Sequence, residues 1–240
     1  PLIACPSMPD KVVPVSEVAG ERVEQVMIGS CTNGGYEDIL PGAKMLKGQE
    51  VAKHTEMIIA PASKQSAEIL ARQGWVAELM AAGVNFSEAT CGACIGIGHV
   101  PASDSVSLRT FNRNFEGRSG IEDDNVYLCS PQVATAAAIA GEIVDPRDLA
   151  EELDLEAPEI EMPEKYDGSK ADLISPDNAI DDELIKGPNI GDVPLKDPLG
   201  DTVGGETILR MEDNITTDHI IPATADILKF RSNIERLSEF

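Results

Sequence analysis

The chain has 240 residues, of which 42% are hydrophobic, and a formal net charge of -23. This length is enough for one large domain or two smaller ones, with a core that needs no disulfide or metal to hold it. The negative charge repels phosphate backbones and anionic lipid, so nucleic acid and membrane surfaces are not expected partners, and no stretch of about 18 apolar residues predicts a transmembrane helix.

Short apolar segments alternate with helix signals over residues 1–150. Residues 1–24 predict an extended entry segment with one edge strand. Further strands are expected at 23–29, 56–60, 84–89, 106–110 and 126–129. Helices are expected at 38–47, between Ser63 and Gly74, at 76–82 and at 131–143, with Asp38, Ser63 and Ser130 as caps and Pro41 in a first turn. The alternation predicts an α/β fold, a three-layer α/β/α domain with a mainly parallel sheet.

Residues 151–200 differ from the rest in charge. They hold 15 acidic and 4 basic residues, a net charge of -11. Together with their prolines, this predicts an irregular acidic linker. Residues 201–240 follow it, with a strand pair expected at 202–211 and a helix at 227–240. They are interpreted as the opening of a second domain, since about 40 residues do not easily form a stable domain alone.

The chain contains five cysteines, an odd number. This argues against a disulfide framework and favours a reducing, cytoplasmic compartment. Cys129 ends an expected strand and is interpreted as a buried residue. Cys31 and the pair Cys91 and Cys94 each follow an expected strand. In a parallel sheet such positions share one edge, where ligands bind.

Spacing alone leaves the chemistry of these three cysteines open. A Cys-x-x-Cys pair occurs in redox disulfides, in zinc sites and in iron–sulfur sites. A zinc site needs a fourth ligand, and His99 is a candidate for it. Simple burial of all three thiols is the remaining alternative.

Two further polar stretches are candidates for a site. Arg113 and Arg118 lie five residues apart in one loop and can grip carboxylates bidentately. The alternative is that they pair with local acids. Asp218 and His219 can form an acid/base pair, or a helix cap beside an ordinary histidine.

Four stretches, taken together, resemble the aconitase/isopropylmalate dehydratase family, and specifically its aconitate hydratase-like members. They occur in the family's order and at compatible separations: Ile28-Gly29-Ser30-Cys31-Thr32-Asn33, Cys91-Gly92-Ala93-Cys94-Ile95-Gly96, Asn112-Arg113-Asn114-Phe115-Glu116-Gly117-Arg118 and Thr217-Asp218-His219. The resemblance covers nearly all of the chain. It implies the third α/β domain of the family over 1–150, the linker over 151–200 and an incomplete swivel-domain segment over 201–240.

The resemblance implies a [4Fe-4S] cluster held by Cys31, Cys91 and Cys94. Its fourth iron has no protein ligand and is left for substrate, on which it acts as a Lewis acid. We expect the isolated chain to be purified without an intact cluster, because its loops are exposed without the remaining domains.

The resemblance also implies a set of residues that act on a di- or tricarboxylic acid. The substrate-binding residues are Asn112, Arg113, Arg118 and Arg231, and the catalytic residues are Asp218 and His219. The family's serine base and its catalytic histidines have no match here, and His54 and His99 are interpreted as ordinary loop residues. We therefore expect a fragment that is inactive without the missing domains of the same protein.

The implied reaction is the reversible isomerisation of citrate and isocitrate through cis-aconitate. The attached swivel segment favours this single-chain type. The first alternative is a related hydro-lyase for isopropylmalate or homocitrate, because the motifs do not fix the substrate. Ala93 departs from both types, since some aconitases have Pro at this position and the isopropylmalate enzymes carry a different pair between the two cysteines. The second is a non-catalytic binding or regulatory relative.

Overall fold

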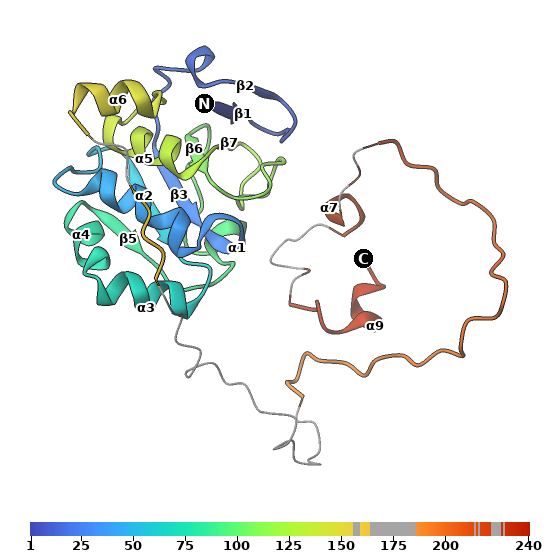
Figure 1. Ribbon diagram of the computed structural model, residues 1–240. Helices are drawn as coiled ribbons and strands as arrows, with labels where there is room; N and C mark the ends of the chain where they lie inside the picture. Colours follow the sequence, from blue (N-terminus) through green and yellow to red (C-terminus); the bar gives the residue numbers. More distant parts are fainter. Residues whose placement is uncertain (156–158, 164–185, 214, 216, 222–226, 228) are drawn as a thin grey trace. The chain divides into compact units, whose positions relative to one another are not determined.

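The computed structural model describes residues 1–155, 159–163, 186–213, 215, 217–221, 227 and 229–240 (Figure 1). The chain divides into two units, Pro1–Ala171 and Asp172–Phe240. Half of the expected linker over 151–200, residues 156–158 and 164–185, lies outside the described residues.

In the described part of the first unit, seven strands form one sheet in the order β2-β1-β7-β6-β3-β4-β5 (Figure 1). The strands are β1 (Leu2–Ala4), β2 (Val12–Pro14), β3 (Gln25–Gly29), β4 (Glu56–Ala60), β5 (Val84–Phe86), β6 (Val106–Arg109) and β7 (Asn125–Leu128). The five strands from β7 to β5 are parallel, whereas β1 pairs antiparallel with both β2 and β7. The predicted α/β class and mainly parallel sheet are confirmed, and the expected single edge strand is a hairpin of two.

β3 lies at the centre of the parallel strands and sets their register. It pairs with β4 on one side, where Gly29 lies opposite Ala60, and with β6 on the other, where Met27 lies opposite Arg109. All five residues of β3 are buried. Because these strands run in the same direction, the loops after Gly29, Phe86 and Arg109 leave from one edge of the sheet.

The helices of the first unit follow the expected order. They are α1 (Ser30–Asn33), α2 (Tyr36–Leu46), α3 (Lys64–Arg72), α4 (Trp75–Ala81), α5 (Pro131–Ala140) and α6 (Pro146–Glu152), with the 3-10 turns η1 (Val15–Glu17) and η2 (Ala93–Ile95). Ser63 and Ser130 cap α3 and α5 as predicted. No helix in the described residues is both long enough and apolar enough to cross a membrane.

α2 begins three residues earlier than a cap at Asp38 predicts. Its N-cap is Gly35, and the Asp38 carboxylate accepts a hydrogen bond from the Gly35 N–H at 3.0 Å. Asp38 therefore supports the cap from the third helical position instead of being the cap. Pro41 consequently lies in the second turn and not in the first.

The two faces of the sheet are covered differently. On one face, Val26 and Ile28 of β3 belong to a large apolar cluster with residues of α2 and α5. On the other face, Met27 of β3 packs in a small cluster with Ala93, Cys94 and Phe111. The layer on this second face is therefore built from η2 and loops that follow β5 and β6.

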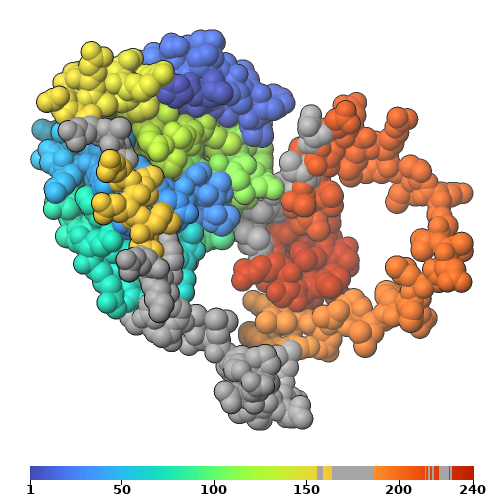
Figure 2. Space-filling view, viewed as in Figure 1, coloured from blue at the N-terminus to red at the C-terminus, as the bar shows by residue number. Residues whose placement is uncertain are grey.

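The segment 159–163 is attached to the first unit through α2. Lys44 Nζ donates a hydrogen bond to the Glu159 carbonyl, and Figure 2 shows the segment on the surface there. A part of the acidic stretch thus contacts the domain that precedes it.

The second unit contains less regular structure than predicted. Its described helices are α7 (Thr217–Ile220) and α9 (Ile234–Leu237). The predicted strand pair at 202–211 is wrong: these residues form no strand, and the Ile208 side chain is 96% exposed. An isolated strand pair has too little apolar surface to hold its ladder. The predicted helix at 227–240 is reduced to α9 where it is described.

Replacing Ser130 with Ala is expected to lower the free energy of unfolding by about 1 kcal/mol. Ser130 Oγ accepts a hydrogen bond from the Val133 N–H at 3.3 Å, and the helix that it opens packs on β3. Urea unfolding measures the difference. Ser130→Asn is the control because Asn also caps helices, and an equal loss in both variants would show that the cap is not the cause.

Candidate functional site

The loop that carries Cys31 leaves β3 through a strained turn. Gly29 has φ +124° and Ser30 has φ +58°. A Cβ on Gly29 would lie 1.9 Å from the Ala60 carbonyl oxygen, so only glycine fits where β3 and β4 end side by side. The turn places Cys31 in the short helix α1, where it is an exposed free thiol.

Thr110, the residue after β6, ties this turn to the neighbouring strand. Its Oγ1 accepts a hydrogen bond from the Gly29 N–H at 3.0 Å, and its carbonyl accepts one from Asn33 Nδ2. Thr110 is buried. It therefore couples the position of the Cys31 loop to the start of the arginine loop, and sequence reasoning assigned it no role.

The loop after β5 carries the other two cysteines. Cys91 is exposed, whereas Cys94 is buried in the apolar cluster with Met27 and Phe111. Both are free thiols. The turn ends at Gly96, which has φ +78°.

The cysteine loop and the arginine loop are in close contact at Gly96. A Cβ there would lie 2.0 Å from the Ser119 carbonyl oxygen. This contact places Arg118 beside the buried cysteine, and Arg118 Nη2 donates to Cys94 Sγ at 3.4 Å. The structure thus brings together one predicted ligand and one predicted carboxylate-binding residue.

Arg118 has hydrogen-bonding capacity that the described residues leave unused. Its Nε and Nη1 atoms are buried with no hydrogen-bond partner among those residues. Its guanidinium carbon lies 5.8 Å from the centre of the Phe115 ring, and it forms no ion pair with a described carboxylate. The alternative hypothesis, that Arg118 pairs with a nearby acid, is therefore not supported among the described residues. The unpaired Nε and Nη1 donors fit a carboxylate ligand.

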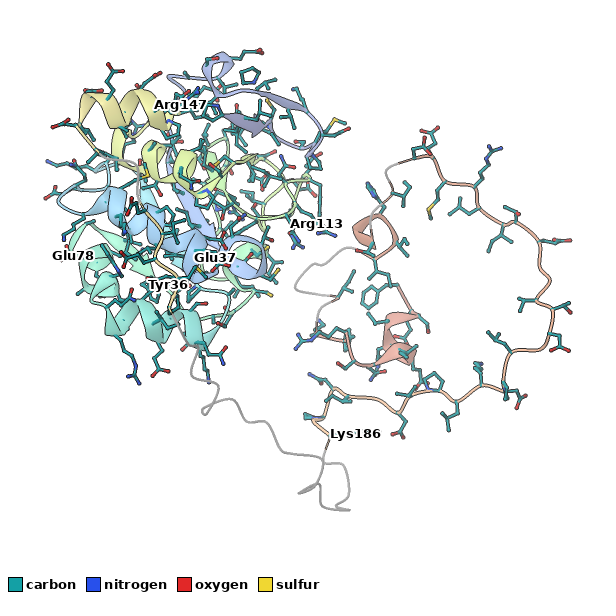
Figure 3. All side chains as sticks on the ribbon, viewed as in Figure 1. Tyr36, Glu37, Glu78, Arg113, Arg147 and Lys186 are labelled. Carbon is teal, nitrogen blue, oxygen red and sulfur yellow. The ribbon has the colours of Figure 1, made fainter. Side chains whose placement is uncertain are left out.

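The rest of the arginine loop is held to the sheet by Asn114. Asn114 is fully buried, and its Nδ2 donates to the carbonyls of Cys5 at 2.7 Å and Val126 at 3.0 Å. Asn112 is exposed and Arg113 is half-buried on the same loop. Figure 3 shows Arg113 at the periphery of the first unit.

The three thiols are suitable cluster ligands by residue type, but their side chains are not gathered around one point in this structure. All three are free cysteines on loops from one sheet edge, and thiolates are the ligands of such clusters. Among the described residues, no group of three or more His, Cys, Asp or Glu side chains is arranged to hold a metal ion. The donor set therefore fits the cluster, and the convergence of Cys31 with Cys91 and Cys94 stays a prediction.

The remaining histidine and cysteine predictions concern residues outside this site. His99 Nδ1 lies 3.3 Å from Glu56 Oε1, so the candidate fourth zinc ligand contacts a carboxylate of β4. His54 Nε2 is hydrogen-bonded to the Gly141 carbonyl at 3.0 Å. Cys129 is predicted to be buried, but it is only half-buried and packs against the main apolar cluster. Desolvation there raises the pKa of its thiol.

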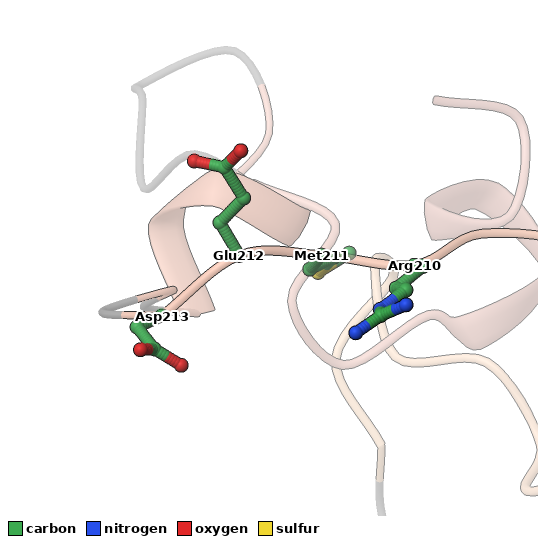
Figure 4. A pocket seen from close by; sticks show the side chains of 4 residues that line it. All are labelled: Arg210, Met211, Glu212 and Asp213. Carbon is green, nitrogen blue, oxygen red and sulfur yellow. The ribbon is translucent and has the colours of Figure 1, made fainter.

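Asp218, His219 and Arg231 belong to the second unit. His219 is exposed on α7, and Arg231 lies in an exposed turn before α9. The Asp218 backbone belongs to α7, and its side chain lies outside the described residues. A cavity of this unit is lined by four consecutive residues from Arg210 to Asp213 (Figure 4), and none of the predicted site residues lines it.

Comparison with known proteins gives a consistent set of matches. A model of the aconitase family (aconitate hydratase) matches residues 4–141. The 3-isopropylmalate dehydratase large subunit of Oleidesulfovibrio alaskensis is 44% identical over 151 residues, which is 62% of this chain and 36% of that protein. The large subunit 1 of the same enzyme from Archaeoglobus fulgidus is 45% identical over 151 residues, with the same coverage.

A third relative carries a different name. The homoaconitase large subunit of Thermus thermophilus is 43% identical over 154 residues, which is 63% of this chain and 37% of that protein. The chain thus spans little more than a third of the length of the curated relatives that it matches.

Proposed function

Because the chain belongs to the aconitase family, we propose that it is the cluster-binding part of a hydro-lyase for hydroxy di- or tricarboxylic acids. Cys31, Cys91 and Cys94 are the proposed ligands of a [4Fe-4S] cluster. When bound, the cluster supplies a Lewis acid for the hydroxyl group that leaves the substrate. The chain's own contribution is to hold the thiols and to orient the substrate beside them.

The observation that carries this proposal is the position of Arg118. One of its nitrogens donates to Cys94 Sγ, while Nε and Nη1 are buried and unfilled within the described residues. A carboxylate bound to those atoms is anchored next to a cluster ligand, so the hydroxyl on its neighbouring carbon is held at the reacting centre. Arg113 and Asn112, on the same loop, are proposed for a second carboxylate.

The names of the relatives favour the first alternative over citrate. They act, by name, on 3-isopropylmalate or as homoaconitase, so we propose a substrate of the isopropylmalate or homocitrate type. The relatives are also large subunits by name, which supports a separate partner chain as a source of the remaining walls of the site. Asp218 and His219 are proposed as catalytic residues and Arg231 as a further substrate-binding residue.

The test uses the full-length gene product, reconstituted anaerobically with iron and sulfide. Turnover of isopropylmalate, homocitrate and citrate is compared with and without a small subunit. We expect one of the first two acids to give the highest kcat/KM. A clear preference for citrate would contradict the substrate assignment, and no turnover by a cluster-loaded protein with any of the three acids would contradict the proposed activity.

Arg118→Gln is expected to lower kcat/KM about ten- to hundred-fold, the loss of a charge-assisted pair worth about 1.5–3 kcal/mol. The matched control is Arg147→Gln, because Arg147 lies on α6, away from the Arg113 loop (Figure 3). Rates are divided by cluster content, since Arg118 also contacts Cys94. Equal effects of the two variants would remove Arg118 from substrate binding.

A further inference from the structure

The largest fully buried side chain of the described residues is a cation. Arg109, the last residue of β6, is 1% exposed. Burial lowers the pKa of Arg109 to about 10, against the attraction of Asp124 and Cys94, so the guanidinium is charged at neutral pH. Burying a charge is costly, and an apolar side chain of similar size often serves stability as well or better. Arg109 is therefore expected to have a role beyond packing the core.

The contacts of Arg109 point toward the cysteine loop. Its Nε donates to Ser107 Oγ at 3.1 Å and its Nη2 to Gln25 Oε1 at 3.1 Å, both on the sheet. Its Nη1 donates to the carbonyl oxygen of Ala93 at 3.5 Å. Ala93 stands between Cys91 and Cys94, so the guanidinium connects the sheet to the middle of the Cys-x-x-Cys turn.

Gln25 extends the same hydrogen-bond network to His99, further along the loop. While its Oε1 accepts from Arg109 and from Ser107 Oγ at 2.9 Å, its Nε2 donates to the His99 carbonyl at 3.4 Å and to Glu56 Oε2 at 3.1 Å. Two backbone carbonyls of the loop, those of Ala93 and His99, are therefore hydrogen-bonded to side chains of the sheet.

Arg109 also places positive charge close to the buried thiol. Its guanidinium donates to the carbonyl of Ala93, the residue before Cys94, and interacts electrostatically with Cys94. The Cys94 sulfur also accepts a hydrogen bond from Arg118 Nη2. Thiolates and their cluster carry net negative charge, and nearby charge is one of the factors that set a cluster's reduction potential. Asp124, the carboxylate that attracts Arg109, offsets part of this positive charge.

We propose that Arg109 is a positioning residue for the Cys91–Cys94 turn: it fixes the turn through Ala93 and, with Gln25, through His99, and it lends positive charge to the Cys94 side of the cluster. The positioning role concerns the protein without any cluster. The electrostatic role rests on the function proposed above.

The experiment compares Arg109→Met, Arg109→Lys and the control Ser107→Ala in this chain. The control removes a hydroxyl that bonds Arg109 and Gln25 but leaves the two loop carbonyls with their donors. In the cluster-free protein, amide hydrogen exchange is followed for residues 92–97. We expect exchange about tenfold faster in Arg109→Met, the effect of losing one buried hydrogen bond, with little change in Ser107→Ala and in the amides of β3.

The reconstituted protein gives a second, separate measurement. Arg109→Met is expected to release iron to a chelator about tenfold faster than the control, and its cluster is expected to have a lower reduction potential than that of Arg109→Lys, which keeps the charge. Equal potentials in the Met and Lys variants would overturn the electrostatic half of the proposal.

The outcomes separate the two proposals. If the wild-type chain takes up no iron and sulfide, the proposed function fails, and hydrogen exchange still decides the role of Arg109 in the loop. If residues 92–97 exchange at the same rate in Arg109→Met and Ser107→Ala, the positioning role is overturned. If circular dichroism shows that Arg109→Met is unfolded, hydrogen exchange of residues 92–97 in Arg109→Lys decides the positioning role. The lysine ammonium cannot replace all three hydrogen bonds of the guanidinium, so these amides must still exchange faster than in Ser107→Ala.

Discussion

Cys94→Ser is expected to abolish the visible thiolate-to-iron absorption of the chain after anaerobic reconstitution with iron and sulfide. A serine hydroxyl is close in size to the thiol but is not deprotonated at neutral pH, so the fold is kept and the ligand is lost. Cys94 is also the cysteine that contacts Arg118, so the substitution alters one of the contacts between the two loops. Absorption and iron content per chain measure the effect, and Cys31→Ser and Cys91→Ser are expected to match it.

The chain provides its own matched control in Cys129. This cysteine lies just after β7, and burial raises the pKa of its thiol, which makes it a poor ligand. Cys129→Ser should therefore keep the full absorption. Retention of the absorption in Cys31→Ser would remove that residue from the ligand set, and stoichiometric zinc without iron uptake in the wild type would sink the cluster proposal.

Gly96→Ala is expected to destabilise the chain by about 3 kcal/mol. Of this, about 1 kcal/mol comes from placing a Cβ at φ +78°, and about 2 kcal/mol comes from forcing that Cβ against the Ser119 carbonyl oxygen, 2.0 Å away in the unrelaxed structure. Separation of the two backbones would also move Arg118 away from Cys94. Urea unfolding measures the loss of stability, and the yield of reconstituted cluster measures the effect of moving Arg118.

Gly48→Ala isolates the contact from the backbone strain. Gly48 has the same φ of +78°, and a Cβ there has no atom within 4 Å. Gly48→Ala should lower the free energy of unfolding by about 1 kcal/mol and leave the cluster yield unchanged. Losses of equal size at the two glycines would mean that the cysteine and arginine loops do not press on each other at Gly96.

The secondary structure was largely readable from local signals. Ser63 and Ser130 were identified as caps because a capping hydroxyl acts within three residues of chain. The predicted start of α2 is three residues too late, because Asp38 supports the cap from inside the helix. A carboxylate near a helix start gives the same sequence signal as a cap or as the third helical residue. The expected strand pair at 202–211 is absent because an isolated pair of strands is at best marginally stable without a third strand or a packed helix.

The sequence by itself determined the family, through four motifs and their order, and with it the α/β sheet whose edge carries Cys31, Cys91 and Cys94. Strand and helix periods and the chemistry of thiols and guanidinium groups are properties of short segments, so they can be read without a fold. Only the tertiary structure decided that Arg118 lies on Cys94, that Gly96 faces Ser119, and that Arg109 and Gln25 hold the cysteine loop from the sheet. These contacts join residues that lie between 16 and 84 positions apart, and no local pattern specifies which distant groups a folded sheet brings within hydrogen-bonding distance.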